Sequence, residues 1–88
     1  MKKRFAFYYR MKPEPQKIHA VVPRHVAYWE KLPGNGVQGG PFADYAAGLV
    51  CFSADNIESA ATIVMQDPFV LEDLLDDVWI KEWVVTSP

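Results

Sequence analysis

Residues 78–85 have the sequence Val-Trp-Ile-Lys-Glu-Trp-Val-Val, and residues 5–9 have the sequence Phe-Ala-Phe-Tyr-Tyr. Both stretches are short, rich in β-branched or aromatic residues and free of glycine and proline, which is typical of β-strands. Because successive side chains alternate between the two faces of a strand, Trp79 and Trp83 share one face while Val78 and Ile80 share the other. Both faces of the predicted sheet are therefore apolar.

A helical pattern follows the first strand after a stiff, proline-containing connection at residues 11–16. Its apolar stripe, at alternating spacings of four and three, consists of Ile18, Val22, His25, Trp29 and Leu32. A proline inside a helix is costly but is welcome at the first position. We therefore expect the main helix to run from Pro23 to Leu32, before the stop signal at residues 33–36, with residues 17–22 forming a separate turn or a kinked segment.

The remaining segments complete an alternating order of strands and helices. Residues 37–42 and 49–52 suit the two strands of a hairpin, and the glycines in the first strand indicate a bulge, an edge or a close backbone approach. Asn56 is a helix N-cap, and this helix ends before Pro68. A short helical segment over residues 71–75 then leads into the strand at residues 78–85. The order β-α-β-β-α-β predicts an α+β, ferredoxin-like fold with a four-stranded antiparallel sheet.

The chain of 88 residues is short for the amount of apolar side chain that it carries, since half of its residues are hydrophobic. Its length predicts a single domain spanning residues 1–88. Two helices can cover only one side of a four-stranded sheet, so the second apolar face needs another cover. A homodimer packed sheet to sheet is the simplest arrangement that provides it.

Charge and cysteine content indicate the environment of the protein. Residues 1–31 carry a net charge of +6 and residues 32–88 a net charge of −8, which favours self-complementary electrostatics over a basic nucleic-acid surface. The single cysteine, Cys51, fits a reducing compartment, and the apolar run after the N-terminal basic residues is too short for a signal peptide or a membrane span. We therefore expect a cytoplasmic protein with no membrane or nucleic-acid partner.

Five segments, in this order and spacing, resemble the YciI-like (YCII-related) domain family. These are residues 23–29 (PRHVAYW), 39–44 (GGPFAD), 48–50 (GLV), 55–58 (DNIE) and 67–69 (DPF). The resemblance implies a dimeric α+β barrel of ferredoxin-like protomers, with a histidine–aspartate pair in a pocket beside the sheet. It does not imply a substrate, although a dehydrochlorinase of chlorinated hydroquinone breakdown belongs to the superfamily. An arginine that often stands three residues before the histidine is Val22 here, and Arg24 is its neighbour instead.

His25 is the first candidate for chemistry. If the helix begins at Pro23, His25 lies in the first helical turn, where the helix dipole disfavours the imidazolium and keeps the ring able to act as a base. The alternative interpretation is a hydrogen-bonded histidine that only packs in the core.

Two aspartates are candidate partners for His25. Asp67 directly precedes a proline, so its extended backbone could present the carboxylate to the imidazole, as in catalytic triads. An ordinary N-cap role at Pro68 is compatible with this. Asp44 is the rival, and its alternative role is that of a turn aspartate. We expect the pocket to be lined by Trp29, Gly39, Gly40, Pro41, Phe42 and Phe69.

These residues favour a cofactor-independent enzyme that acts on a small organic molecule by proton transfer, of the isomerase, lyase or dehydrochlorinase type. No histidine spacing indicates a metal site, and the third strand, residues 46–52, lacks the basic-glycine-aromatic run of RNA-recognition motifs. The competing interpretation is a non-catalytic dimer that binds or senses a small ligand in the same pocket. The sequence alone leaves these two classes open.

Overall fold

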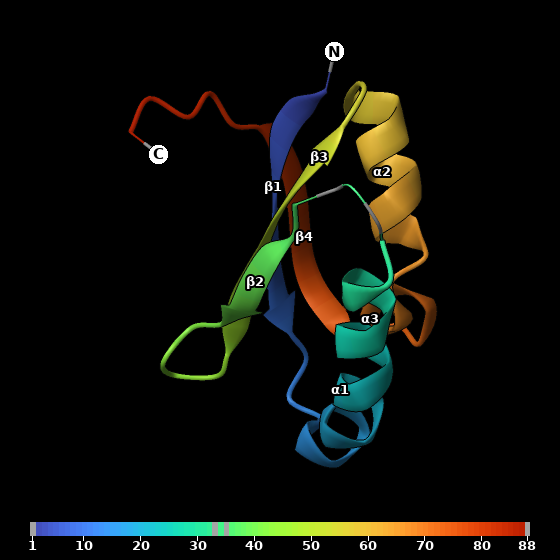
Figure 1. The fold of residues 1–88 in the computed structure, drawn as a ribbon. Coiled ribbons are helices and arrows are strands. Elements are labelled where there is room, and N and C mark those ends of the chain that lie inside the picture. The colour runs from blue at the N-terminus through green and yellow to red at the C-terminus, as the bar shows by residue number, and fades with distance from the viewer. Residues whose placement is uncertain (1, 33, 35, 88) are drawn as a thin grey trace.

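The chain builds one sheet with helices on one side of it. The structure, a computed structural model, describes residues 2–32, 34 and 36–87. Its elements are β1 (Lys3–Met11), α1 (Pro15–Glu30), β2 (Gln38–Pro41), β3 (Ala47–Ala54), α2 (Ile57–Met65), α3 (Pro68–Leu71) and β4 (Leu75–Glu82). The strands are antiparallel in the order β2-β3-β1-β4, and the helices cover one face (Figure 1). The predicted ferredoxin-like α+β fold is confirmed.

The alternation of side chains along β1 divides the two faces of the sheet. Phe5, Phe7 and Tyr9 are buried beneath the helices, while Ala6 and Tyr8 between them are only partly covered. Phe5 faces Phe52 of β3 in the register, and their rings are 6.2 Å apart. The core therefore lies between the helices and the central strands β1 and β3.

Helix α1 is longer than the sequence predicted. It begins at Pro15 rather than Pro23, and Pro23 lies inside it, so the expectation of a separate segment at residues 17–22 is wrong. Pro23 is on the exposed side of the helix, where the carbonyl freed by its missing N–H can be hydrated. Two residues of the predicted stop signal, Pro33 and Asn35, lie outside the described part of the chain.

The last strand is also displaced from its predicted position. It spans Leu75–Glu82 rather than residues 78–85, and the short helix before it is Pro68–Leu71 rather than residues 71–75. Its last ladder contact is Trp83 N–H donating to the Arg4 carbonyl. Because β1 begins at Lys3, the residues after Trp83 have little further strand to pair with. They leave the sheet on the side away from the helices (Figure 1).

The face opposite the helices, here called the outer face, is apolar and exposed. Tyr8 stacks on Trp79 at 5.2 Å, and Trp79 and Trp83 are 40% and 47% exposed. A shallow hollow on this face is lined by Ala6, Leu49, Cys51, Trp79, Lys81, Glu82 and Trp83. No helix within the described residues is long and apolar enough to cross a membrane.

Candidate functional site

A cavity of about 970 Å³ opens between α1 and the sheet, on the helix-covered face. Helix α1 supplies one wall through residues such as Ile18, Val22 and Val26, and the strands supply the opposite wall through residues such as Val50 and Gly39. The volume is within the range of small-molecule sites, whose walls are mostly apolar with a few placed polar groups. His25 is one of these polar groups.

Asp67 is completely buried beside this cavity and accepts hydrogen bonds from three directions. His25 Nδ1 lies 2.9 Å from both carboxylate oxygens, Trp29 Nε1 donates to Oδ2 at 2.8 Å, and the Phe69 backbone N–H donates to Oδ1 at 2.8 Å. The last bond is the N-cap of α3, so the two roles considered for Asp67 coexist. Pro68 at the first helical position fixes the extended backbone that turns the carboxylate towards α1.

The orientation of the His25 ring follows from its neighbours. Phe69 stacks on the ring at 4.1 Å and 12°, and Tyr9 meets it edge-on at 5.7 Å and 68°. Because Asp67 can only accept, the Nδ1 of a neutral His25 ring carries the proton and Nε2 carries the lone pair. No buried side-chain nitrogen or oxygen among the described residues lacks a hydrogen-bond partner. Nε2 has no such partner and must therefore retain accessible surface, and His25 lines the cavity.

The helix position expected for His25 is wrong. His25 lies in the second half of α1 rather than in its first turn, because the helix starts eight residues earlier than predicted. The positive end of the helix dipole therefore does not act on the imidazole, since that effect fades within the first turn. The hydrogen bond to Asp67 determines the ring's tautomer instead.

The two candidate carboxylates are separated by the structure. Asp44 lies in an exposed turn between β2 and β3, where its Oδ1 accepts the N–H of Ala46 at 3.0 Å. This is the turn role considered from the sequence. Asp67 is the aspartate that the structure brings to His25, and Asp44 is not among the residues that line the cavity.

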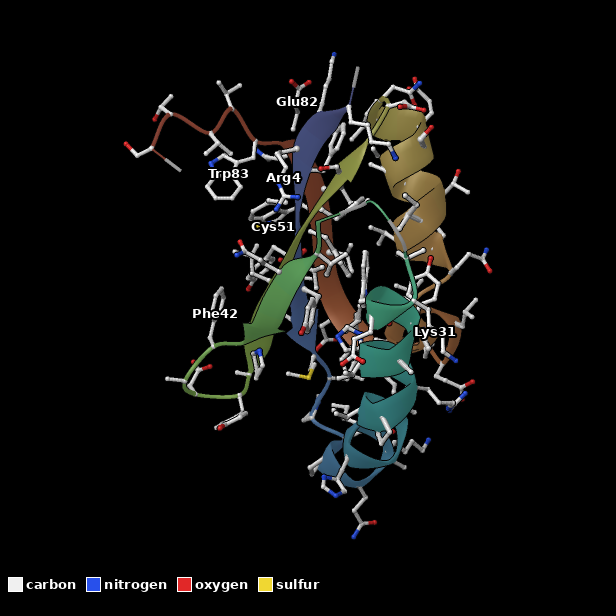
Figure 2. The ribbon with its side chains drawn as sticks, in the orientation of Figure 1. Arg4, Lys31, Phe42, Cys51, Glu82 and Trp83 are labelled. Carbon is white, nitrogen blue, oxygen red and sulfur yellow. The ribbon has the colours of Figure 1, made fainter. Side chains whose placement is uncertain are left out.

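Five of the six residues expected around the pocket line the cavity, namely Trp29, Gly39, Gly40, Pro41 and Phe69. Phe42 does not. It points away from α1, and its ring lies 6.3 Å from that of Tyr8 on the outer face (Figure 2). Strand alternation explains this, since one residue past Pro41 the side chain points to the opposite side.

Two contributions to the site were missed from the sequence. Trp29 was expected as part of the wall, but its indole N–H also holds the Asp67 carboxylate. Tyr9 was assigned to the strand alone, yet it lines the cavity beside His25. Burial, and secondarily the negative charge of Asp67, raise the pKa of Tyr9 to about 12. The position of Tyr9, an aromatic residue near the end of the first strand, was the sequence feature that could have indicated a place in the cavity.

Lys12 and Glu30 also line the cavity, but within the described part of the chain no hydrogen bond or ion pair joins either of them to His25 or Asp67. Arg24, the neighbour of His25 in sequence, is exposed and faces Glu72 at 3.9 Å. Among the described residues, no group of three or more His, Cys, Asp or Glu side chains is placed to hold a metal ion.

Comparison with known proteins identifies one matching family and several solved structures with the same fold. The sequence profile of the YCII-related domain matches residues 3–84. No curated protein matches the chain.

Solved structures resemble the chain over nearly its whole length. The 5-chloro-2-hydroxyhydroquinone dehydrochlorinase TftG from Burkholderia phenoliruptrix AC1100, in complex with 2,5-dihydroxybenzoquinone, is 23% identical with a TM-score of 0.79. The alignment covers 92% of this chain and 93% of that one. SnoaB, a cofactor-independent oxygenase from Streptomyces nogalater, is 13% identical with a TM-score of 0.60, over 99% of this chain and 95% of that one. At these identities the likeness establishes the fold.

Proposed function

Because the chain belongs to the YCII-related domain family and holds a histidine–carboxylate pair beside a cavity, we propose that it is a cofactor-independent enzyme that transfers a proton on a small organic molecule. The observation that carries this proposal is the orientation of His25. One ring nitrogen is bound by Asp67, and the other is accessible from the cavity. A histidine that only packs in the core does not require a ring nitrogen that is accessible from a cavity.

The proposed step is general base catalysis by His25. Nε2 takes a proton from an acidic O–H or C–H of the substrate, and the Asp67 carboxylate stabilises the imidazolium that forms. In an isomerase the imidazolium returns the proton to another atom of the substrate. In a dehydrochlorinase the electron pair left behind forms a new π-bond, chloride leaves with the C–Cl bonding pair, and the imidazolium releases its proton to water.

An edge strand supplies a further group for this chemistry. The Phe42 N–H donates to the Ala47 carbonyl, and the alternation of antiparallel ladder bonds then turns the Gly39 N–H away from β3. The same alternation turns the Gly40 N–H towards Leu49 of β3, so of the two glycines we assign the stabilisation of a developing oxyanion to the Gly39 N–H. At Gly39 a Cβ atom would meet Leu49 and Val50 of β3, so the glycine lets the two strands approach closely there.

The first compound to test is the substrate in the name of TftG, 5-chloro-2-hydroxyhydroquinone. We expect the chain to release chloride from it, and we expect His25→Asn to lower turnover by about 10²–10⁴-fold because the base is removed while the shape is kept. Asp44→Asn is the matched control and should leave turnover unchanged. Chloride release by the His25→Asn variant at the wild-type rate would contradict the proposal. Tight binding of the compound without turnover would favour the ligand-binding alternative.

We further propose that the chain forms a homodimer through the outer face. The exposed rings of Trp79 and Trp83 and the Tyr8–Trp79 stack support this, because large aromatic side chains gathered on one face are characteristic of protein interfaces. The single free cysteine, Cys51, lies on this face and supports a reducing, cytoplasmic location.

A further inference from the structure

A polar group of the sheet lies next to His25 in the lining of the cavity. It is the hydroxyl of Tyr9, whose ring stands edge-on to both His25 and Phe69, at 5.7 Å and 5.8 Å. The cavity walls around these rings are largely aliphatic, with Ile18 and Val22 from α1 and Val50 from β3. Any polar group on such walls is therefore placed to orient a ligand.

The Tyr9 hydroxyl is available to a ligand although the residue is only 2% exposed. Among the described residues, the side-chain hydrogen bonds of tyrosine hydroxyls include one from Tyr28 to the Ile63 carbonyl and none from Tyr9. No buried oxygen of the described side chains lacks a partner, so the Tyr9 oxygen must retain accessible surface. A buried tyrosine whose hydroxyl has no protein partner is unusual, because such groups normally find one.

Gly48 fixes where this hydroxyl lies. It is the cross-strand partner of Tyr9 in the β1–β3 register, so the two residues share a face of the sheet. A Cβ atom at position 48 would overlap the Tyr9 hydroxyl and the adjoining ring carbon. The phenol therefore occupies the space that the missing side chain leaves, and it is held there by a rigid sheet rather than by a mobile loop.

We propose that the Tyr9 hydroxyl donates a hydrogen bond to an oxygen of the ligand, next to the group whose proton His25 takes. This inference rests on the proposed function and narrows its substrate class. The ligand is a largely apolar molecule of about the size of one ring, and it bears a phenolate, enolate or carbonyl oxygen close to its acidic proton. The ring of Phe69, stacked on His25, gives such a planar ligand an aromatic neighbour.

The chemistry of Tyr9 suits a donor rather than a second base. Burial and the nearby Asp67 raise its pKa to about 12, so the phenol keeps its proton at neutral pH. A neutral donor in an apolar cavity favours the ligand form whose oxygen carries the greater negative charge.

Two probes of the same shape test this role without relying on turnover. 4-Nitrophenolate carries a negative oxygen where 4-nitrotoluene carries a methyl group. Their affinities are measured by calorimetry for the wild type, for Tyr9→Phe and for the control Tyr8→Phe, at a pH where the phenol is ionised. Tyr8 lies on the same strand but on the outer face, where phenylalanine keeps the stack on Trp79.

We expect the wild type and Tyr8→Phe to prefer 4-nitrophenolate, and Tyr9→Phe to lose about 10- to 100-fold of that preference while binding 4-nitrotoluene unchanged. An unchanged preference in Tyr9→Phe would overturn the proposal, as would a wild type that binds neither probe or both equally. The effect of His25→Asn on chloride release tests the proposed function separately. Loss of the preference in Tyr9→Phe, together with undiminished chloride release by His25→Asn, would leave the ligand contact standing and remove the catalytic role of His25.

Discussion

At the scale of single residues, the site depends on how Asp67 is surrounded. Its carboxylate accepts from an imidazole, an indole and a backbone N–H, and each of these donors is supplied by a different residue. These three donors hold the carboxylate in one orientation. The carboxylate in that orientation then determines the tautomer of His25. In the proposed mechanism, Asp67 therefore acts through His25 and not by contact with the ligand.

Replacing this acceptor with an amide should reverse the tautomer. In Asp67→Asn the side-chain oxygen can still cap the Phe69 N–H. The NH₂ group then takes the place of Oδ2, where it loses the bond from Trp29 Nε1 and donates to His25 Nδ1. We expect the ring proton to move to Nε2, with turnover falling about 10⁴-fold as in triads with the same exchange. Nitrogen-15 spectra of the ring report the tautomer directly, and the signals of His19 serve as the internal control. A His25 ring that keeps its proton on Nδ1 would refute this.

Titration of the Tyr9 phenol should make the free energy of unfolding depend on pH in the alkaline range. The folded chain holds the phenolic proton up to a pKa of about 12, whereas the unfolded chain releases it near the ordinary value of 10.0. The folded state therefore binds more protons between these values, so stability is fully present below pH 10 and is lost as the pH rises towards 12. We expect the free energy of unfolding to fall by on the order of 2 kcal/mol across this pH interval in the wild type, and we expect no such fall in Tyr9→Phe. Urea unfolding of both proteins at several pH values measures the difference, and parallel curves for the two would contradict it.

The residues of the site differ in how far the sequence revealed them. Asp67 could be named as one of two candidate partners, with Asp44 as its rival, because a carboxylate before proline has a restricted backbone. His25 could be named because it lies on the apolar helical stripe and in a segment that resembles the family. The roles of Trp29 and Tyr9 could not, because they depend on where an indole N–H and a phenol end after the helix docks on the sheet. The space for Tyr9 comes from Gly48, which is 39 positions away in the chain and adjacent only through strand register.

At the scale of elements, α1 is the part whose prediction failed and whose stability can be tested. The sequence placed the helix start at Pro23 because proline is favoured there, but the helix continues through it for eight residues on the N-terminal side. Local propensity was overridden because residues 15–22 add Ile18 and Val21 to the apolar surface that packs on the sheet. Strand β4 was misplaced for a similar reason, since its end is set by the start of β1 and not by its own residues.

Removal of the proline should stabilise α1. In Pro23→Ala the new N–H can donate to the carbonyl of residue 19, and the exposed position of Pro23 leaves room for the change. We expect the free energy of unfolding to rise by about 1–3 kcal/mol, measured by urea denaturation. A decrease would mean that residues 15–22 are not continuous with the rest of the helix.

For the whole molecule, the outer face is the surface through which we propose that two copies associate. If two copies pack through it, a carboxylate placed there would be buried against aromatic rings without a partner, at a cost of several kcal/mol. We expect Trp79→Asp to abolish association or folding, with circular dichroism separating these two results. Light scattering at micromolar concentration should give twice the mass of the 10.0 kDa chain for the wild type. A monodisperse wild-type species of 10.0 kDa would exclude the dimer.

Strand β1 serves both sides of the molecule with alternate residues. Tyr9 faces the cavity, and Tyr8, its neighbour, faces outward against Trp79. The odd-numbered residues of this stretch face the core and, at Tyr9, the cavity, and the even-numbered residues Ala6 and Tyr8 face outward. If the proposed ligand contact and the proposed dimer hold, ligand preference and assembly can therefore change independently during evolution, although one strand carries the residues for both. A one-residue insertion in β1 would exchange the two sets of side chains and destroy both traits at once.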